Sequence, residues 1–284
     1  MGIILAILLF SAIIIIHELG HFLLAKANGI RVDEFSLGLG PTLFGKQFGE
    51  TKFSVKLLPF GGACMMGEDD VEDISEGSFN SKSVWARMSV IVAGPLFNLI
   101  LAWILCMIMI AWVGYRTPVV GGVIDGYSAQ EQGLSEGDVI TKIGGRSVHI
   151  WNDISLYNLT HSEEKEVEIT YKRDGKTHTA VLEPRQKEGD TAPLLGVTGG
   201  KMERPGFFGT LKYGAYTVKY WIDYTVDSLR MLVTGRVGMK DLSGPVGIVS
   251  AVDGVYQEAA PAGLSVIILN LMNIGILITA NLGR

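Results

Sequence analysis

The feature that most constrains this chain is an apolar segment at its N-terminal end, from Ile3 to Leu24. The segment is apolar except for one serine, two histidines, one glutamate and one glycine. A helix needs about 20 residues to cross the hydrocarbon core of a bilayer. We therefore expect residues 1–27 to form a first membrane-spanning helix, around which the rest of the chain is organised.

The ionisable residues of this segment form the pattern H-E-x-x-H, as His17, Glu18 and His21. On a helix the two histidines lie one turn apart on one face, so both imidazoles can reach one metal ion. The alternatives are a satisfied core histidine or a chance match to the pattern. Because an ionisable group at membrane depth costs about 2.5 kcal/mol or more, three within five residues favour a compensating partner. The sequence predicts a zinc site, with His17 and His21 as ligands and Glu18 as the catalytic base.

The composition indicates membrane helices combined with a soluble module, because 48% of the residues are hydrophobic and 19% are charged. The net charge is only −5 and there is no basic tract, so nucleic acid is not expected as a partner. Lysines and arginines follow the first span, and by the positive-inside rule they place the next connection in the cytoplasm. The N-terminus is then expected outside the cytoplasm.

Residues 28–87 contain two segments in which apolar and polar side chains alternate, Glu34–Leu39 and Lys52–Leu57, and this period predicts strands. They are followed by an acidic loop. One interpretation is a plain hairpin. The other is a membrane-associated sheet whose edge pairs with an unwound substrate, with Phe53, Val55 and Leu57 positioning that substrate.

Residues 88–114 and 259–284 are nearly free of charge and predict a second and a third span. Asn98 lies inside the second span and must find a partner there. A helix–helix hydrogen bond and a role beside the substrate are both open for Asn98. The third span carries three asparagines on one face, which we expect to point into the helix bundle: Asn270, Asn273 and Asn281.

Residues 115–186 read as a small α/β domain with a hairpin around Asp174–Gly175. Its run from Gly133 to Val148 resembles a PDZ domain of the bacterial type, and such domains bind peptides by strand addition. The domain could bind incoming substrates, filter them by size, or bind nothing. By the predicted topology it lies outside the cytoplasm.

Residues 187–258 are expected to hold a linker up to Pro205 and then an interfacial amphipathic helix within Gly206–Arg236, marked by a stripe of tyrosines. A turn is expected at LSGPVGI, Leu242–Ile248. The predicted fold class is a multi-span α-helical membrane protein with a cytoplasmic-side β-hairpin region and an inserted α/β PDZ domain.

Several motifs together resemble the site-2 protease family, specifically its bacterial RseP-type regulators: HExxH in the first span, LLPFGG, AGPLFN ending at Asn98, the PDZ insert and LSGPVGI. The resemblance implies a zinc intramembrane endopeptidase of the bacterial cytoplasmic membrane. Its substrates would be transmembrane helical proteins, such as anti-sigma factors already trimmed by another protease. The strand region resembles the family's membrane-reentrant β-loop.

In this family a distant aspartate of an L-D-G motif is the third zinc ligand. The sequence ends before such a motif, so we expect a chain truncated before it and inactive as given. The alternative is a non-catalytic membrane scaffold or pseudoprotease in which the PDZ domain captures partners. An L-D-G motif further along the gene would favour the enzyme.

Overall fold

The computed structural model describes residues 2–67, 74–161, 163–187, 193–236 and 245–282. The chain divides into two compact units. One unit contains residues 1–105 and 240–284, and the other contains residues 106–239.

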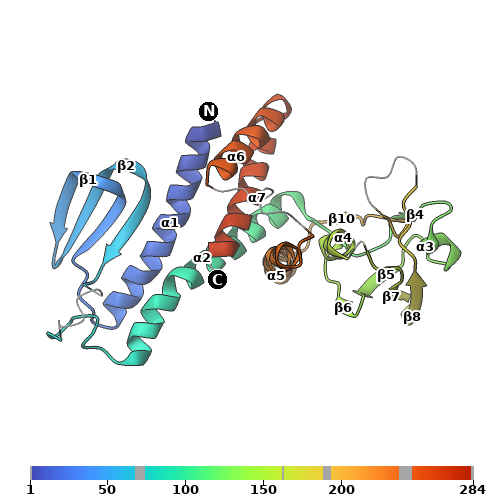
Figure 1. Cartoon of the computed structure of the whole chain (residues 1–284), viewed down its shortest axis with the longest axis horizontal. Coiled ribbons are helices and arrows are strands. Elements are labelled where there is room, and N and C mark those ends of the chain that lie inside the picture. Colours follow the sequence, from blue (N-terminus) through green and yellow to red (C-terminus); the bar gives the residue numbers. More distant parts are fainter. Residues whose placement is uncertain (1, 68–73, 162, 188–192, 237–244, 283–284) are drawn as a thin grey trace. The chain divides into compact units, whose positions relative to one another are not determined.

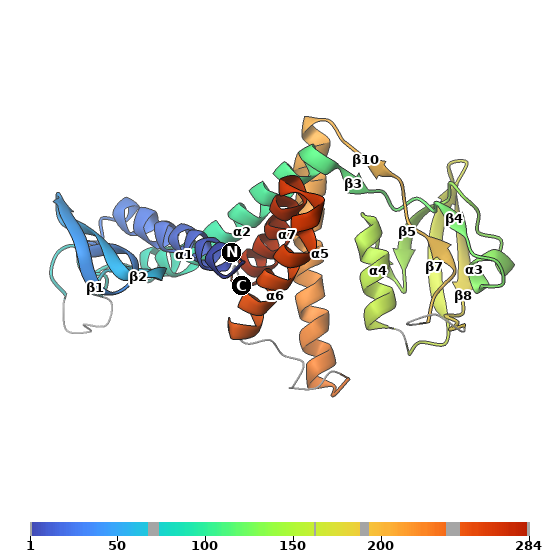
Figure 2. The same ribbon diagram turned by 90° about the horizontal axis from the view of Figure 1, so that it is seen from above.

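The first unit is built on long apolar helices. Within the described residues, three helices are long and apolar enough to cross a membrane, which confirms the three predicted spans: α1 (Gly2–Ala27), α2 (Val84–Val113) and α7 (Leu264–Leu282). A further helix, α6 (Pro245–Ala259), packs against α1 and α7. Figure 1 shows α1 between a small sheet on one side and α6 and α7 on the other, and Figure 2 shows the same order from above.

The small sheet consists of β1 (Glu34–Phe48) and β2 (Thr51–Met65), which pair in antiparallel fashion around Gly49. Both strands are longer than the alternating segments predicted. The first part of β1, Glu34–Leu37, is in register with two parts of β2, Lys52–Val55 and Gly62–Met65. Glu34–Leu37 therefore lies in the middle of the sheet, and Gly62–Met65 forms one of its edges.

Many large apolar side chains of this sheet are exposed, which suits contact with a bilayer. They are Leu39, Leu43, Phe44, Phe48, Val55, Leu57, Leu58 and Met65.

The C-terminal region differs from the prediction in two places. The third span begins at Leu264 rather than at residue 259, because a 3₁₀ turn (Ala260–Ala262) and Gly263, with φ of 98°, end the preceding helix. The turn predicted at Leu242–Ile248 is wrong from Pro245 onward, where α6 begins, since proline is well tolerated in the first turn of a helix. The rest of that motif, residues 242–244, and residues 68–73 of the acidic loop lie outside the described residues.

The core of the second unit is a four-stranded sheet with the order β6-β5-β7-β8. The strands are β5 (Val139–Ile143), β6 (Arg146–Ser147), β7 (Val167–Arg173) and β8 (Lys176–Leu182), and the helices beside them are α3 (Ser128–Glu131) and α4 (Trp151–Thr160). The predicted hairpin is present, with Asp174 and Gly175 at φ of 50° and 76°. These elements enclose one hydrophobic core, to which Trp151, Ile154 and Tyr157 of α4 contribute.

The segment expected as a linker instead closes this domain. Two short strands, β9 (Val197–Thr198) and β10 (Met202–Glu203), pair with β4 (Gly122–Val123) and β3 (Tyr115–Arg116). Strands of two residues carry no periodic signal, so the sequence pattern could not reveal them. We refer to residues 115–203 as the PDZ-like domain.

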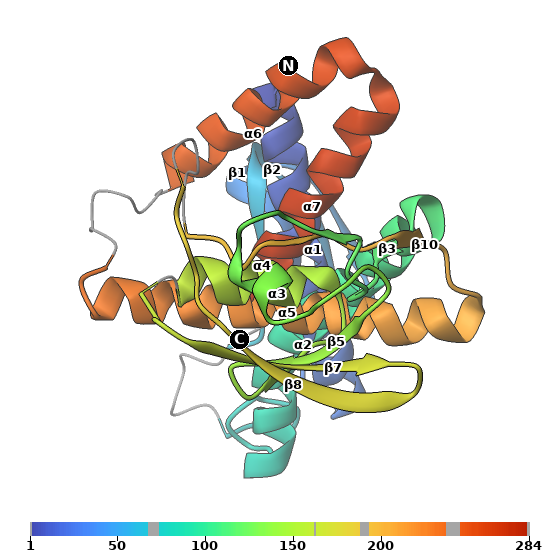
Figure 3. The same cartoon turned by 90° about the vertical axis from the view of Figure 1, so that its right-hand side faces the viewer.

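The predicted tyrosine-rich helix is α5 (Phe207–Val233). Its tyrosines pack on the PDZ-like domain: Tyr213 stacks on Tyr115 at 3.8 Å and Tyr216 on His149 at 3.9 Å between ring centroids. Figure 3 shows α4 and α5 running alongside each other. The tyrosine face of α5 is therefore occupied by protein, and a position of this helix at the membrane surface stays a prediction.

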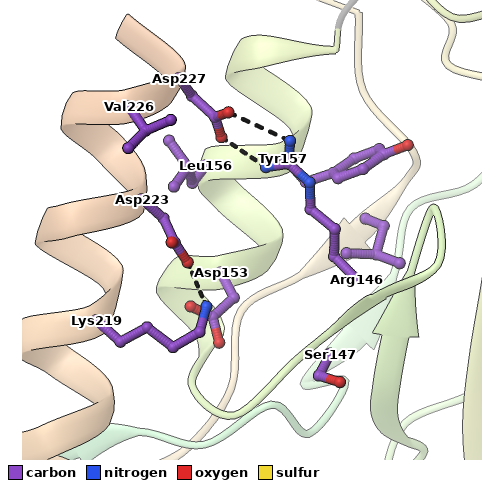
Figure 4. Close-up of a pocket in the computed structure, with 10 residues that line it drawn as sticks. Arg146, Ser147, Asp153, Leu156, Tyr157, Lys219, Asp223, Val226 and Asp227 are labelled. Atoms are coloured by element: carbon purple, nitrogen blue, oxygen red, sulfur yellow. Dashed lines mark hydrogen bonds and ion pairs between the residues drawn. The ribbon is translucent and has the colours of Figure 1, made fainter.

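An ion pair fixes the same contact near the other end of α5. Arg146 donates two hydrogen bonds to the carboxylate of Asp227, at 2.6 and 3.2 Å. Figure 4 shows this pair beside Tyr157. Both residues of the pair line a cavity of about 360 Å³, together with side chains from α4 and α5. The Asp227 side chain is only 6% exposed, so the guanidinium compensates a buried charge.

Candidate metal centre

The two histidines of the H-E-x-x-H pattern converge on one point beside α2. A Cβ atom added to Gly94 would lie 2.6 Å from Nε2 of His17 and 2.4 Å from Nε2 of His21. A Cβ added to Gly20 would lie 2.6 Å from the backbone oxygen of Ala93. The two glycines therefore let α1 and α2 approach closely. Both Nε2 atoms face the space left free at Gly94.

The other ring nitrogen of each histidine is held by α2. His21 Nδ1 lies 2.7 Å from the carbonyl oxygen of Val90, which can only accept, so Nδ1 carries the proton and Nε2 keeps its lone pair. His17 Nδ1 lies 3.0 Å from Nδ2 of Asn98. The contact of His21 is the one typical of metal-binding histidines, which donate a hydrogen bond through the nitrogen that does not face the metal.

Glu18 is held by the edge of the small sheet. Its Oε2 accepts a hydrogen bond from the backbone N–H of Cys64 at 3.0 Å. A Cβ on Gly62 would lie 3.5 Å from Cγ of Glu18, so this part of β2 lies directly against the carboxylate-bearing side chain. The predicted base therefore sits between the histidine pair of α1 and the edge Gly62–Met65.

These residues fit a zinc ion. The Nε2 atoms of two imidazoles lie close together beside Gly94, which has no side chain to crowd them, and a fixed carboxylate follows His17 in sequence. Among the residues that the structure describes, no third histidine, cysteine, aspartate or glutamate completes a group with them. Within the described residues, His17 and His21 are therefore the side chains placed where they could hold a metal ion together.

The other predicted site residues lie in two different places. Asn98 is fully buried and contacts His17 directly. Phe53 packs edge-on against Phe22 on α1 at 5.7 Å between ring centroids. Val55 and Leu57 are 44% and 53% exposed.

The strand segment that reaches Glu18 is therefore Gly62–Cys64, and the sequence reasoning did not single it out. The glycine pair at the end of LLPFGG could have indicated this segment, because glycine in a strand often marks a close approach of the backbone to a neighbouring group.

The predicted polar face of α7 makes a different contact from the one expected. The amides of Asn273 and Asn281 donate to carbonyl oxygens of their own helix. The hydroxyl of Thr279, which is fully buried, donates instead to the backbone oxygen of Asn98 at 3.1 Å. Thr279 is the residue through which α7 holds the turn of α2 that carries Asn98.

Known proteins resemble this chain over nearly its whole length. The family model described as Peptidase family M50 matches residues 5–282. A candidate zinc metalloprotease of Clostridium acetobutylicum is 37% identical over 282 residues, covering 99% of this chain and 80% of that protein. The regulator of sigma-W protease RasP of Bacillus subtilis is 29% identical over 363 residues, covering 98% of this chain and 83% of that protein. Among solved structures, the PDZ domain of an SdrC-like protein from Listeria monocytogenes matches with 28% identity and a TM-score of 0.25, covering 30% of this chain and 88% of that one.

Proposed function

Because this chain belongs to peptidase family M50, we propose that it is a zinc-dependent endopeptidase that cleaves transmembrane segments of other proteins inside the membrane. The observation that carries the proposal is the convergence of the Nε2 atoms of His17 and His21 beside Gly94, within a membrane-spanning helix. Glu18 lies next to His17 in sequence and is fixed by the N–H of Cys64.

His17 and His21 would hold the zinc ion, which when bound polarises a peptide carbonyl and makes water a better nucleophile. Glu18 takes the proton from the attacking water and passes it to the leaving amine. The hydrogen bond from Cys64 restricts the rotation of the Glu18 side chain, so the carboxylate is already oriented before substrate arrives.

A substrate can be presented to Glu18 as an added strand. Peptide bonds in a transmembrane helix are hydrogen-bonded within the helix, so cleavage requires an unwound, extended segment. Pairing with the edge Gly62–Met65 would hold such a segment beside Glu18. The exposed side chains of Val55 and Leu57 would then contact flanking parts of the substrate, while Phe53 supports the sheet from its packed side.

The substrates we propose are membrane proteins of the anti-sigma-factor type in the bacterial cytoplasmic membrane. One relative is named as a regulator of sigma-W protease, which supports this class. The excess of lysine and arginine after the first span supports a PDZ-like domain outside the cytoplasm. There the domain would act on which substrates enter, by excluding those with bulky outer domains.

The test is Glu18→Gln in the full-length protein, reconstituted with a transmembrane substrate. Cleavage should be lost while zinc stays bound, because Glu18 is not a ligand. His17→Ala and His21→Ala should lose both zinc and cleavage. Loss of zinc from Glu18→Gln alone, by metal analysis of the purified variant, would contradict the assigned roles. Retained cleavage in Glu18→Gln would contradict the proposed reaction.

A further inference from the structure

We infer that Asn98 is a positioning residue of the metal centre: its side-chain oxygen accepts a hydrogen bond from Nδ1–H of His17 and thereby turns the Nε2 lone pair of that histidine toward zinc. The inference rests on the proposed function and refines it. It assigns Asn98 a role toward a ligand, whereas the sequence left open a helix–helix hydrogen bond and a role beside the substrate.

Asn98 is placed for this role by helix geometry. It follows Gly94 by four residues on α2, so both lie on the same face, one turn apart. Gly94 faces the Nε2 atoms, and Asn98 lies 3.0 Å from Nδ1 of His17. The side chain is fully buried, so no water competes for this contact.

The orientation of the amide decides what the contact does. With Nδ2 beside Nδ1, the amide donates, the proton of His17 must sit on Nε2, and the metal-facing atom has no lone pair. This orientation also leaves Oδ1 of Asn98 buried without a hydrogen-bond partner. Oxygen and nitrogen of an amide have nearly the same shape, so a half-turn of the group exchanges them without changing the packing.

After that exchange, Oδ1 accepts from Nδ1–H of His17, as the Val90 oxygen does from His21. Both histidines then carry the same tautomer and present Nε2 lone pairs to the same point. The amide nitrogen then takes the buried position that has no partner within the described residues.

The backbone under Asn98 is fixed as well. Thr279 of α7 donates its hydroxyl to the Asn98 carbonyl oxygen at 3.1 Å, and both residues are fully buried. The turn of α2 that holds His17 is therefore tied to a second membrane helix. A rigid support of this kind is what keeps a ligand in one orientation before the metal arrives.

The experiment compares Asn98→Leu and Asn98→Asp in the complete chain, purified in lipid nanodiscs. Nitrogen NMR of ¹⁵N-histidine-labelled, metal-free protein reads the tautomer of His17 directly. We expect the Nδ1–H form in the wild type and in Asn98→Asp, and a shift to the Nε2–H form in Asn98→Leu. Competition with a chromophoric chelator should show zinc affinity falling about 10- to 100-fold in Asn98→Leu. Asn98→Asp, which keeps an acceptor, should restore it.

Asn273→Leu is the matched control, because it removes a membrane asparagine whose amide donates to its own helix. It should change neither the tautomer nor zinc affinity. If Asn98→Leu fails to fold, Asn98→Ala repeats the comparison with a smaller side chain. Wild-type tautomer and affinity in the apolar variant would overturn the inference. A wild type that binds no zinc but shows the expected tautomer would sink the proposed function and still support the orientation of His17 by Asn98.

Discussion

Gly94→Ala is expected to abolish tight zinc binding while leaving the fold intact. The new methyl group would lie 2.4 Å from Nε2 of His21 and 2.6 Å from Nε2 of His17. Non-bonded heavy atoms prefer about 3.5 Å, so each imidazole would have to retreat by about 1 Å. Zinc–nitrogen bonds are about 2.0–2.1 Å long, and a retreat of that size takes the ligands out of reach.

The expected loss of zinc affinity in Gly94→Ala follows from which atoms the new methyl group displaces. Losing only a supporting partner of a metal ligand costs about 10- to 100-fold in affinity. Gly94→Ala acts on both ligands themselves, so we expect a loss of at least about 100-fold, equivalent to about 2.8 kcal/mol. Helix propensity works in the opposite direction, because alanine is favoured over glycine by about 1 kcal/mol in a helix interior.

The assay is zinc competition with a chromophoric chelator, together with thermal unfolding of the metal-free protein in detergent. Gly254→Ala on α6 is the control, since its Cβ would meet nothing within 4 Å. It should keep zinc affinity near the wild-type value and raise stability by up to about 1 kcal/mol. Wild-type zinc affinity in Gly94→Ala, accompanied by a lower melting temperature, would mean that α1 and α2 simply move apart, and it would refute the argument that Gly94 preserves the metal position.

Three further predictions concern the second unit. Replacing residues 115–203 with a short turn should allow untrimmed substrates to be cleaved and leave trimmed ones nearly unaffected; unchanged discrimination in a cleavage assay with matched long and short substrates would exclude a filtering role. Arg146→Met should leave the Asp227 carboxylate buried without its cation and destabilise the packing of α5 by about 3 kcal/mol, seen as faster proteolysis within α5. Burial raises the pKa of Asp138, but hydrogen bonds that include the Arg173 guanidinium outweigh it and hold this pKa below its usual range. The ionised Asp138 carboxylate therefore stabilises the folded domain above its unfolded pKa of about 3.9, and this stabilisation is lost as the pH falls through the lowered folded pKa. Asp138→Asn should lower the melting temperature at pH 7 and flatten the decline of the melting temperature in acid.

The sequence predicted those parts of the molecule that repeat a local pattern. The spans followed from uninterrupted apolar runs, the hairpin at Asp174 from its turn residues, and α5 from tyrosine spacing. The proximity of the His17 and His21 rings followed from helical spacing, and their role as zinc ligands stays a prediction.

The parts that could not be predicted depend on contacts between distant segments. Gly62–Cys64 reaches Glu18 only because β2 folds back beside β1, and no local pattern encodes that approach. Gly94 leaves room for the side chains of His17 and His21, and Thr279 donates one hydrogen bond from its hydroxyl to the Asn98 carbonyl oxygen. Patterns in a single sequence register neither contribution. The asparagines of α7 show the same limit. Helical spacing placed them on one face and predicted contacts within the bundle, but the side-chain amides of Asn273 and Asn281 donate to backbone carbonyl oxygens of their own helix.

The short ladder between β3 and β10 has a consequence for how such a chain can change over evolutionary time. Tyr115 pairs with Glu203, so the PDZ-like domain leaves and returns to the chain at neighbouring positions, about 5 Å apart in a paired ladder. Tyr115 follows α2 almost immediately, and Glu203 precedes α5 by a few residues. A segment whose two ends meet in this way can be exchanged, duplicated or lost as a cassette while the flanking helices stay connected at the same spacing. The PDZ-like domain could therefore diversify without any change to the residues around His17 and His21.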